Sequence, residues 1–332
     1  MYEERVFGIN MNDLVSIIMP VFNAEKFVNR AINSVLEQSY KNFQLIIIND
    51  GSTDRSKEIC HEFSQKDSRI FFINQKNAGP SSARNHGLQY VKGEYVMFLD
   101  ADDTLEKKAL ETLVHVFIEK SVDLCVYAWN TVSETKKVAY KYKYSELHCT
   151  KEQIYNNIVI HPFKCGGGFP WNKIWRTKKL RDQGKIILFD ERLSSYEDKL
   201  WVLKCMDHIE KICFLNMPLY NYYIQENSSS HYSTNELEKL YQAYNAALII
   251  NEYISLFHVS AKKNADKLVW LFLVNYVFGA ELQKKNGNRA INHVELRNQL
   301  ILSGIKSINI KAIVKYVILY LNMKMRKKAG DQ

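Results

Sequence analysis

The chain has 332 residues, more than a single hydrophobic core usually organises, so we expect a main domain with an appended region. Hydrophobic residues form 46% of the sequence and charged residues 24%, without any repeated or biased tract, which excludes disordered and fibrous classes. No apolar run reaches the roughly 18 residues of a membrane-spanning helix. Six cysteines without a C-x-x-C pair, and no secretion signal, predict a cytoplasmic protein without zinc or disulfides.

The net charge of +9 is concentrated at the C-terminal end. Residues 262–332 contain 14 Lys and Arg against four acidic residues. A helical period places Lys311, Lys315 and Arg326 on one side of a helix. Two interpretations stay open: a helix packed on the main domain, or an amphipathic helix on the anionic inner face of the plasma membrane. No nucleic-acid-binding motif is present, so we expect no nucleic-acid partner.

Short runs rich in Val, Ile and Phe alternate with helix-length segments in the first hundred residues. The runs predict strands at Val15–Val21, Phe43–Ile48, Ile70–Ile73 and Tyr95–Leu99. The segments between them predict helices at 24–38, 54–65 and 80–90, with start signals at Asn23, Thr53 and Pro80. This alternation predicts an α/β protein with a mostly parallel central sheet that is covered on both faces.

The pattern changes after the apolar run Leu124–Tyr127, and apolar spacing becomes helical from about Asn235. The run Leu268–Ala280 predicts a buried helix, with an interfacial helix as the alternative. We therefore expect an N-terminal extension (1–13), a catalytic domain (14–232) and a helical, basic C-terminal region (233–332). The catalytic domain would divide into a nucleotide-binding half (14–120) and an acceptor half (121–232).

Acidic residues follow the fourth predicted strand, at the sheet edge where ligands bind in such folds. Asp100 and Asp102 lie two residues apart, so an extended segment would direct both carboxylates toward one ion. Carboxylates without neighbouring His or Cys favour Mg²⁺ or Mn²⁺ over zinc. The alternative is that Asp102, Asp103 and Thr104 cap the helix that follows.

Two further strand-end residues suit a nucleotide. Asp50 follows the second predicted strand and can accept a hydrogen bond from a nucleobase imide N–H, or serve only as a turn residue. Arg84 falls on the first turns of a predicted helix, where it can contact a base or phosphate, or remain a surface cation.

The order of these motifs resembles glycosyltransferase family 2, of the bacterial polysaccharide type. The resemblance is carried by four segments in the order and spacing of that family: Pro20-Val21-Phe22-Asn23, Asp50-Gly51-Ser52-Thr53-Asp54, Asn77-Ala78-Gly79 with Ala83-Arg84-Asn85-His86-Gly87, and Phe98-Leu99-Asp100-Ala101-Asp102-Asp103. It is close over residues 14–120 and looser to about 232. It implies the GT-A fold and an inverting, metal-dependent transferase.

The resemblance also implies roles for single residues. Asp102 would bind the divalent cation, Mn²⁺ or Mg²⁺, and Asp100 would contact the sugar side of the donor. The remaining nucleotide-sugar contacts would come from Pro20, Phe22, Asn23, Asp50 and Arg84. Phe22 stands where the family more often has Tyr, which keeps a stacking face without the hydroxyl.

The acceptor side of the resemblance begins further along the chain. Asp198 would be the catalytic base, with Glu197 beside it, although a carboxylate pair at a helix N-terminus also suits the helix dipole. Trp171, Asn172 and Lys173 follow three glycines and would form the acceptor side, as a mobile loop or a plain turn. His231 is a candidate metal ligand or a structural residue.

These features predict transfer of a hexose or N-acetylhexosamine from a nucleoside diphosphate sugar, with UDP favoured, to a hydroxyl of a growing cell-surface glycan. A lipid-linked acceptor at the membrane would explain the basic tail. Two alternatives remain: a nucleotidyltransferase, which would release pyrophosphate, and a non-catalytic partner subunit with the same fold. The first would need a basic first loop, whereas residues 20–26 offer only Lys26.

Overall fold

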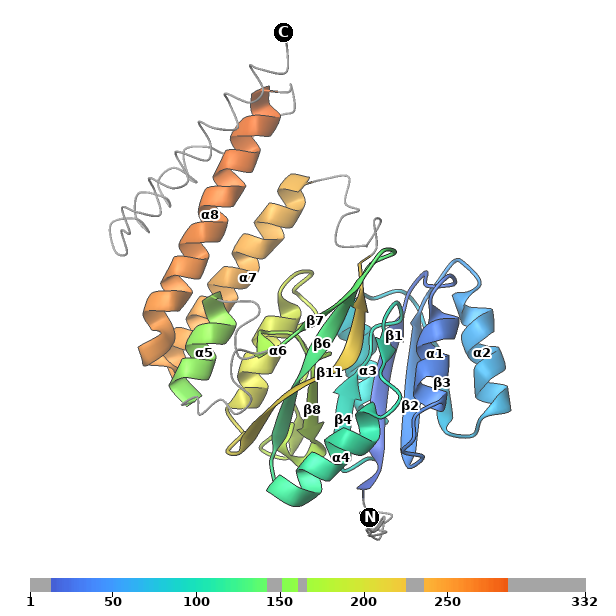
Figure 1. Ribbon diagram of the computed structural model, residues 1–332. Coiled ribbons are helices and arrows are strands. Elements are labelled where there is room, and N and C mark those ends of the chain that lie inside the picture. The colour runs from blue at the N-terminus through green and yellow to red at the C-terminus, as the bar shows by residue number, and fades with distance from the viewer. Residues whose placement is uncertain (1–12, 142–150, 161–165, 225–235, 286–332) are drawn as a thin grey trace.

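The four apolar runs of the first hundred residues form parallel strands at the centre of the molecule (Figure 1). The computed structural model describes residues 13–141, 151–160, 166–224 and 236–285. The strands lie in the order β3-β2-β1-β4, with bounds β1 (Val15–Val21), β2 (Phe43–Asp50), β3 (Ile70–Gln75) and β4 (Tyr95–Phe98). All four predicted starts are confirmed. Burial on both faces explains the continuous apolar runs of β1, β2 and β4, whereas the edge strand β3 is only partly buried and Phe71 is exposed.

The connecting helices are α1 (Val28–Leu36), α2 (Ser56–Lys66) and α3 (Pro80–Leu88). The predicted start signals at Asn23 and Thr53 were wrong. Asn23 adopts a left-handed conformation (φ 49°), and its side chain binds the Thr53 N–H, so it caps no helix. The third signal is confirmed, because Pro80 is the first residue of α3.

The second half of the sheet is mixed rather than mostly parallel. Strand β8 (Lys173–Arg176) lies antiparallel between β4 and β6 (Leu124–Val132), and β11 (Ile212–Tyr223) runs parallel to β6. Two antiparallel strands complete it: β5 (Thr104–Leu105) beside β11, and β7 (Lys137–Tyr140) beside β6. A separate two-stranded ribbon pairs β9 (Arg181–Asp182) with β10 (Lys185–Ile186).

Helices α3 and α6 (Glu197–Met206) pack against the sheet core. Trp201 of α6 meets Phe98 of β4 and Trp175 of β8 edge to face, at 5.3 and 5.4 Å between ring centroids. Helix α4 (Ala109–Lys120) packs on β6 and β11. Short 3-10 turns occur at Thr177–Lys179 and Val259–Ala261.

The C-terminal part of the described chain is a helical hairpin, seen at the left of Figure 1. Helices α7 (Glu236–Phe257) and α8 (Lys262–Lys285) pack on each other, and α8 also packs on α5 (Lys151–Ile160). The helix predicted over Leu268–Ala280 is present in α8, and among its described side chains Leu268, Val269 and Leu273 are buried. Within the described residues, no helix is long and apolar enough to cross a membrane. The basic segment 305–328 and His231 lie outside the described residues.

Candidate active site

The loops that leave β1 and β2 are tied together at the carboxyl edge of the sheet. The Asn23 N–H donates to Ser52 Oγ at 3.1 Å, and Asn23 Oδ1 accepts from the Thr53 N–H at 2.9 Å. Beside this junction Phe22 is 51% exposed, whereas Pro20 is half-buried. An exposed aromatic ring at a strand end is free to stack on a planar base.

Asp50 has a buried carboxylate that organises the loop before α3. Its Oδ1 accepts hydrogen bonds from Gln75 Nε2 at 2.8 Å and from the Ala78 N–H at 2.9 Å. Its Oδ2 accepts from the Gly79 N–H at 2.8 Å. These contacts reach a segment 25 to 29 positions away and not the turn that follows Asp50, and nucleobase recognition by the same carboxylate stays a prediction.

Arg84 brings the two predicted halves of the site together. Its Nη1 lies 3.2 Å from Glu197 Oε1, and its Nη2 lies 3.6 Å from Asp100 Oδ1. The side chain is 11% exposed, so Arg84 is no surface cation. Burial alone would lower the pKa of Arg84, but attraction from Asp100, Glu197 and Asp198 raises it. One buried cation thus holds three carboxylates from distant parts of the chain around itself.

Asp198 lies on the first turn of α6, directly after Glu197. Burial, followed by the negative charge of Glu197, raises the pKa of Asp198 to about 6, although Arg84 opposes the shift. The next residue, Lys199, is buried and donates its N–H to Asp198 Oδ1 at 2.6 Å. A carboxylate with this pKa is a better proton acceptor than an exposed one, which suits a general base.

Asp102 is held through its main chain by a residue that the sequence analysis missed. Arg30 Nη2 donates to the Asp102 carbonyl oxygen at 2.6 Å, and the guanidinium lies 3.5 Å from the ring centroid of Tyr223. Burial and the negative charge of Asp100 raise the pKa of Asp102 to about 6. No motif marks Arg30, because its contact with Asp102 spans 72 positions of sequence.

Asp103 has a structural task that differs from the predicted helix cap. Helix α4 begins only at Ala109, so the cap interpretation of residues 102–104 was wrong. Asp103 instead accepts hydrogen bonds from the Tyr220 hydroxyl and the Tyr223 N–H, both at 2.8 Å. Burial and the neighbouring carboxylates raise its pKa well above the usual range. Asp103 thereby fastens the acidic loop to β11.

The donor chemistry of Asp100 and Asp102 fits a hard divalent cation. Both offer carboxylate oxygens, and burial together with the charge of Asp100 raises the pKa of Asp102, so a nearby cation would favour its charged form. Among the described residues no group of three His, Cys, Asp or Glu side chains could hold an ion alone. Mg²⁺ commonly takes one or two carboxylates and completes its shell with substrate phosphates and water. A two-carboxylate set therefore fits an ion that binds together with a diphosphate.

The glycine-rich loop is ordered around a buried lysine. Lys173 is 1% exposed, and its ammonium donates to the carbonyls of Gly166, Gly167 and Phe169 at 2.7–3.0 Å, and to Asn172 Oδ1 at 2.8 Å. Asn172 is also fully buried. Both side chains therefore hold the loop from within, which agrees with the turn interpretation.

Trp171 belongs to an aromatic stack at the end of β11. Its ring lies 4.8 Å from the ring of Tyr220 and 5.9 Å from that of Tyr222, nearly parallel to both. Tyr222 is 39% exposed, and Trp171 is buried beneath it. The acceptor role predicted for Trp171 stays a prediction, with Tyr222 as the outer face of the stack.

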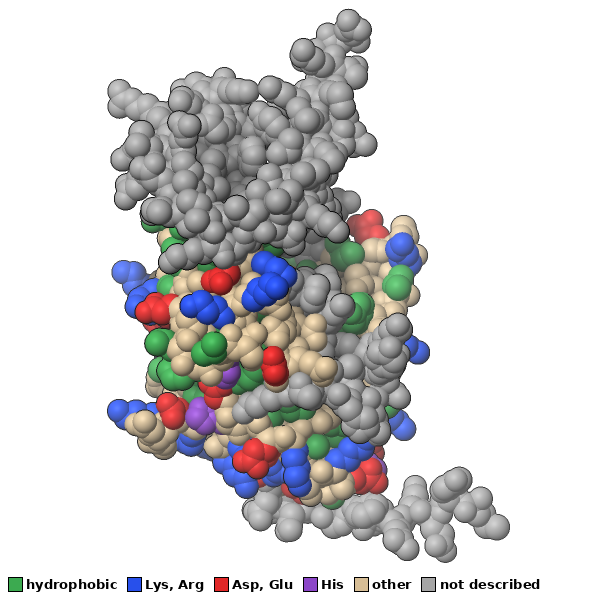
Figure 2. Space-filling model, turned by 90° about the vertical axis from the view of Figure 1, so that its left-hand side faces the viewer, with side chains coloured by type: hydrophobic (Ala, Val, Ile, Leu, Met, Phe, Trp, Pro, Cys, Tyr) green, Lys and Arg blue, Asp and Glu red, His purple; other side chains and the backbone are tan. Residues whose placement is uncertain are grey.

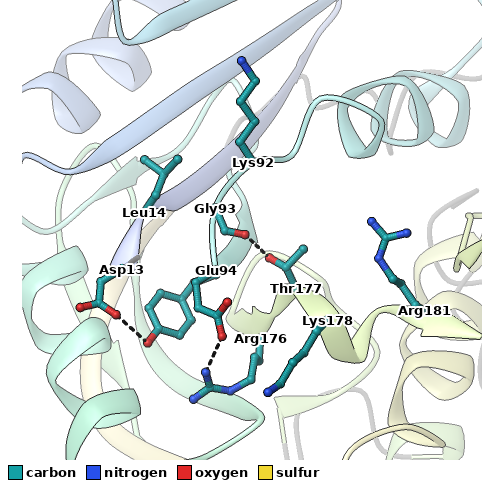
Figure 3. A pocket seen from close by; sticks show the side chains of 10 residues that line it. Asp13, Leu14, Lys92, Gly93, Glu94, Arg176, Thr177, Lys178 and Arg181 are labelled. Carbon is teal, nitrogen blue, oxygen red and sulfur yellow. Dashed lines mark hydrogen bonds and ion pairs between the residues drawn. The ribbon is translucent and has the colours of Figure 1, made fainter. Parts of the chain in front are cut away.

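A cavity of about 610 Å³ opens at the opposite edge of the sheet, by the amino ends of β1 and β4 (Figure 3). An ion pair lines it, with Arg176 Nη1 2.6 Å from Glu94 Oε1, and Thr177 Oγ1 donates to the Gly93 carbonyl. Open α/β sheets bind ligands beyond the carboxyl ends of their strands. The cavity is therefore distinct from the candidate active site.

Comparisons with known proteins agree with this geometry. Residues 16–175 match the family model described as glycosyl transferase family 2. Glycosyltransferase GlyG of Streptococcus pneumoniae is 32% identical over 64% of this chain and 71% of its own length. Glycosyltransferase GlyA of the same organism is 33% identical over 66% of this chain but only 32% of its own length. The chain thus spans about a third of GlyA.

A solved structure of similar fold is that of S. aureus TarS (1–349) in complex with UDP-GlcNAc. It is 25% identical, has a TM-score of 0.61, and the match covers 79% of this chain and 71% of that one. Together with the family model and GlyG, it confirms the predicted resemblance and fold. This chain belongs to glycosyltransferase family 2 and has the GT-A fold.

Proposed function

We propose that this chain transfers a sugar, with inversion, from a UDP-sugar to a hydroxyl of a growing cell-surface glycan. The observation that carries the proposal is the Arg84 bridge, which joins the donor-side residue Asp100 to the Glu197-Asp198 pair. Transfer needs a donor site and a base within reach of one reacting carbon. The solved complex of TarS with UDP-GlcNAc, a protein of similar fold, supports a UDP-sugar as donor.

The donor half would bind the nucleotide at the carboxyl ends of β1 and β2. Phe22 would offer its exposed ring to the base, beside Pro20 and Asn23. Asp50 would hold the 77–79 loop against the nucleotide and offer Oδ2, which accepts a single hydrogen bond here, to the imide N–H. Arg84 would hold the Asp100 carboxylate in place beside the donor sugar.

Asp102 and Asp100 would hold Mn²⁺ or Mg²⁺ together with the donor diphosphate. When bound, the ion would supply Lewis-acid stabilisation of the charge on the departing diphosphate. Arg30 would keep the Asp102 loop in place through its hydrogen bond to the main chain. The raised pKa of Asp102 implies that protons compete with the cation below about pH 6.

Asp198 would take the proton from the acceptor hydroxyl as that oxygen attacks the anomeric carbon of the sugar. The bond from this carbon to the diphosphate breaks, and its electron pair leaves with the nucleoside diphosphate. Glu197, held by Arg84, would contact the acceptor beside Asp198. Asn172 and Lys173 would support the loop that carries Trp171 and the acceptor.

A panel of nucleotide sugars with Mn²⁺ tests the proposal through release of the nucleoside diphosphate. We expect UDP release from at least one UDP-sugar. Asp102→Asn should abolish the Mn²⁺-dependent part of donor binding, whereas Asp198→Asn should bind donor normally and lose transfer. If both variants kept wild-type turnover, the assignment of these residues would be wrong. Release of pyrophosphate instead of UDP would favour a nucleotidyltransferase.

A further inference from the structure

The first turn of α6, which carries Glu197 and Asp198, is contacted by α8 and by α5. Tyr196 precedes the pair in a left-handed conformation (φ 59°), and its ring lies 4.9 Å from that of Phe272 on α8. Lys199 follows the pair, and its ammonium donates to the Val159 carbonyl of α5 at 3.2 Å. Helix α8 therefore contacts the residue before the candidate catalytic pair, and α5, on which α8 packs, contacts the residue after it.

The other end of α6 is attached to α5 and α7 through Asp207, which follows the last helical residue. Its carboxylate accepts hydrogen bonds from the hydroxyls of Tyr155 on α5 and Tyr253 on α7. His258, just after α7, places Nε2 2.9 Å from Asp207 Oδ1 and stacks on the Tyr155 ring at 3.9 Å. Burial and Asp207 raise the pKa of both tyrosines, so their hydroxyls stay protonated donors.

Between these two ends α6 is one continuous helix. The nine residue steps from Asp198 to Asp207, the C-cap of α6, span about 13.5 Å. Trp201 stacks on Phe189 at 4.5 Å between centroids and donates its indole N–H to the Ile187 carbonyl at 2.9 Å, which fixes the inner face. We therefore expect a displacement at Asp207 to move the helix and with it Asp198.

We propose that the α7–α8 hairpin is a positioning element for Asp198, acting through Tyr253, His258 and Phe272. These residues do not touch the reacting atoms. They set the depth and direction of α6, and with them the distance of the base from the donor. The inference rests on the proposed function, since it gives these side chains a role in the transfer that Asp198 performs.

Figure 2 shows the face of the molecule that carries the helical region. Lys and Arg side chains are interspersed there with Asp and Glu on the described surface, without a broad patch of one sign. The hairpin contacts α6 and α5 through aromatic rings and tyrosine hydroxyl groups. A role directed inward, toward the catalytic helix, fits these contacts.

Two substitutions test the positioning role with little change of volume. Tyr253→Phe removes one hydroxyl bond to Asp207, and Phe272→Leu loosens the packing on Tyr196. Tyr241→Phe is the matched control, because it lies on the same helix and packs on Tyr276 instead of on α6. Each variant is assayed for UDP release from UDP-GlcNAc with Mn²⁺, or from whichever UDP-sugar of the panel the wild-type protein hydrolyses, for UDP affinity and for Tm.

We expect kcat to fall about 10- to 100-fold in Tyr253→Phe and Phe272→Leu, because small displacements of a reacting group have effects of this size. UDP affinity should stay within about twofold in both, and the control should match wild type. The acidic limb of the kcat–pH profile should also shift in both, since Asp198 would change its distance from Glu197 and Arg84.

Wild-type kcat in both variants would overturn the inference. So would an equal loss in Tyr241→Phe, or a loss of UDP binding that parallels the loss of kcat, because either would indicate general loosening of the fold. The proposed function is checked separately by Asp198→Asn. If Asp198→Asn turned over like wild type, or no UDP-sugar released UDP, the proposed function would fail and this inference with it.

Discussion

Arg84→Met removes the buried cation that joins the two halves of the site while keeping most of the side-chain volume. Glu197 and Asp100 would then face each other without a counter-charge, at side-chain exposures of 12% and 29%. Breaking a buried pair by removing one partner costs about 3 to 5 kcal/mol. At neutral pH we expect a loss of stability within this range, measured by urea unfolding followed by circular dichroism.

A double-mutant cycle separates the charge effect from lost packing. Glu197→Gln alone leaves Arg84 with Asp100 and should cost less than Arg84→Met. In the double variant Glu197 no longer carries an uncompensated charge and only Asp100 remains, so about 2 kcal/mol of the Arg84→Met loss should be recovered. An Arg84→Met loss below about 1 kcal/mol, or strictly additive effects, would show that Arg84 is solvated and that the bridge does not organise the site.

Three further outcomes follow from the buried polar groups. Because the pKa of Asp198 is raised to about 6, kcat for UDP release should fall about tenfold per pH unit below pH 6. The contribution of this group to stability should make folding more favourable as pH falls from about 6 to 4. An acidic limb of the kcat–pH profile near pH 4 would contradict the burial argument. Lys173→Met leaves several main-chain carbonyls without a donor and should cost about 3 kcal/mol in urea unfolding. Lys66→Met, at an exposed position, should cost less than 1 kcal/mol. Equal costs would refute the role of Lys173. Tyr220→Phe removes the donor of Asp103 Oδ2 and leaves only the Tyr223 N–H on Oδ1, so it should cost about 1 to 3 kcal/mol. Asp103→Asn keeps an acceptor oxygen and should cost less, and the reverse order in thermal unfolding would contradict this role of Asp103.

The sequence was sufficient for the donor half because its signals are local. The starts of all four strands coincide with the starts of apolar runs, and β1, β2 and β4 are covered on both faces while β3 is a partly exposed edge strand. Family-like motifs then fixed the residues at the carboxyl ends of these strands. Helix starts were harder, because Asn23 has the side chain of a cap and uses it to bind the next loop instead.

The acceptor half was less predictable because its contacts are distant in sequence. Strand β8 has four residues with Lys and Arg at its ends, and only its neighbours β4 and β6 make it a strand. Lys173 carries a charge that normally indicates exposure, yet it is enclosed by carbonyl groups of its own loop. The Arg84–Glu197 contact spans 113 positions, and no local pattern encodes it.

Each carboxylate of the acidic loop after β4 has a different role, and the strand order explains why. Residues 104–105 turn into β5, which pairs antiparallel with β11 and brings Tyr220 and Tyr223 against Asp103. With Asp103 occupied in this way, the loop is fixed to the acceptor half, while Asp100 faces Arg84 of the donor half. Asp102 lies between these two anchors with its main chain held by Arg30, beside the Asp100 carboxylate that would share the ion. This arrangement is compatible with the metal role proposed for Asp102.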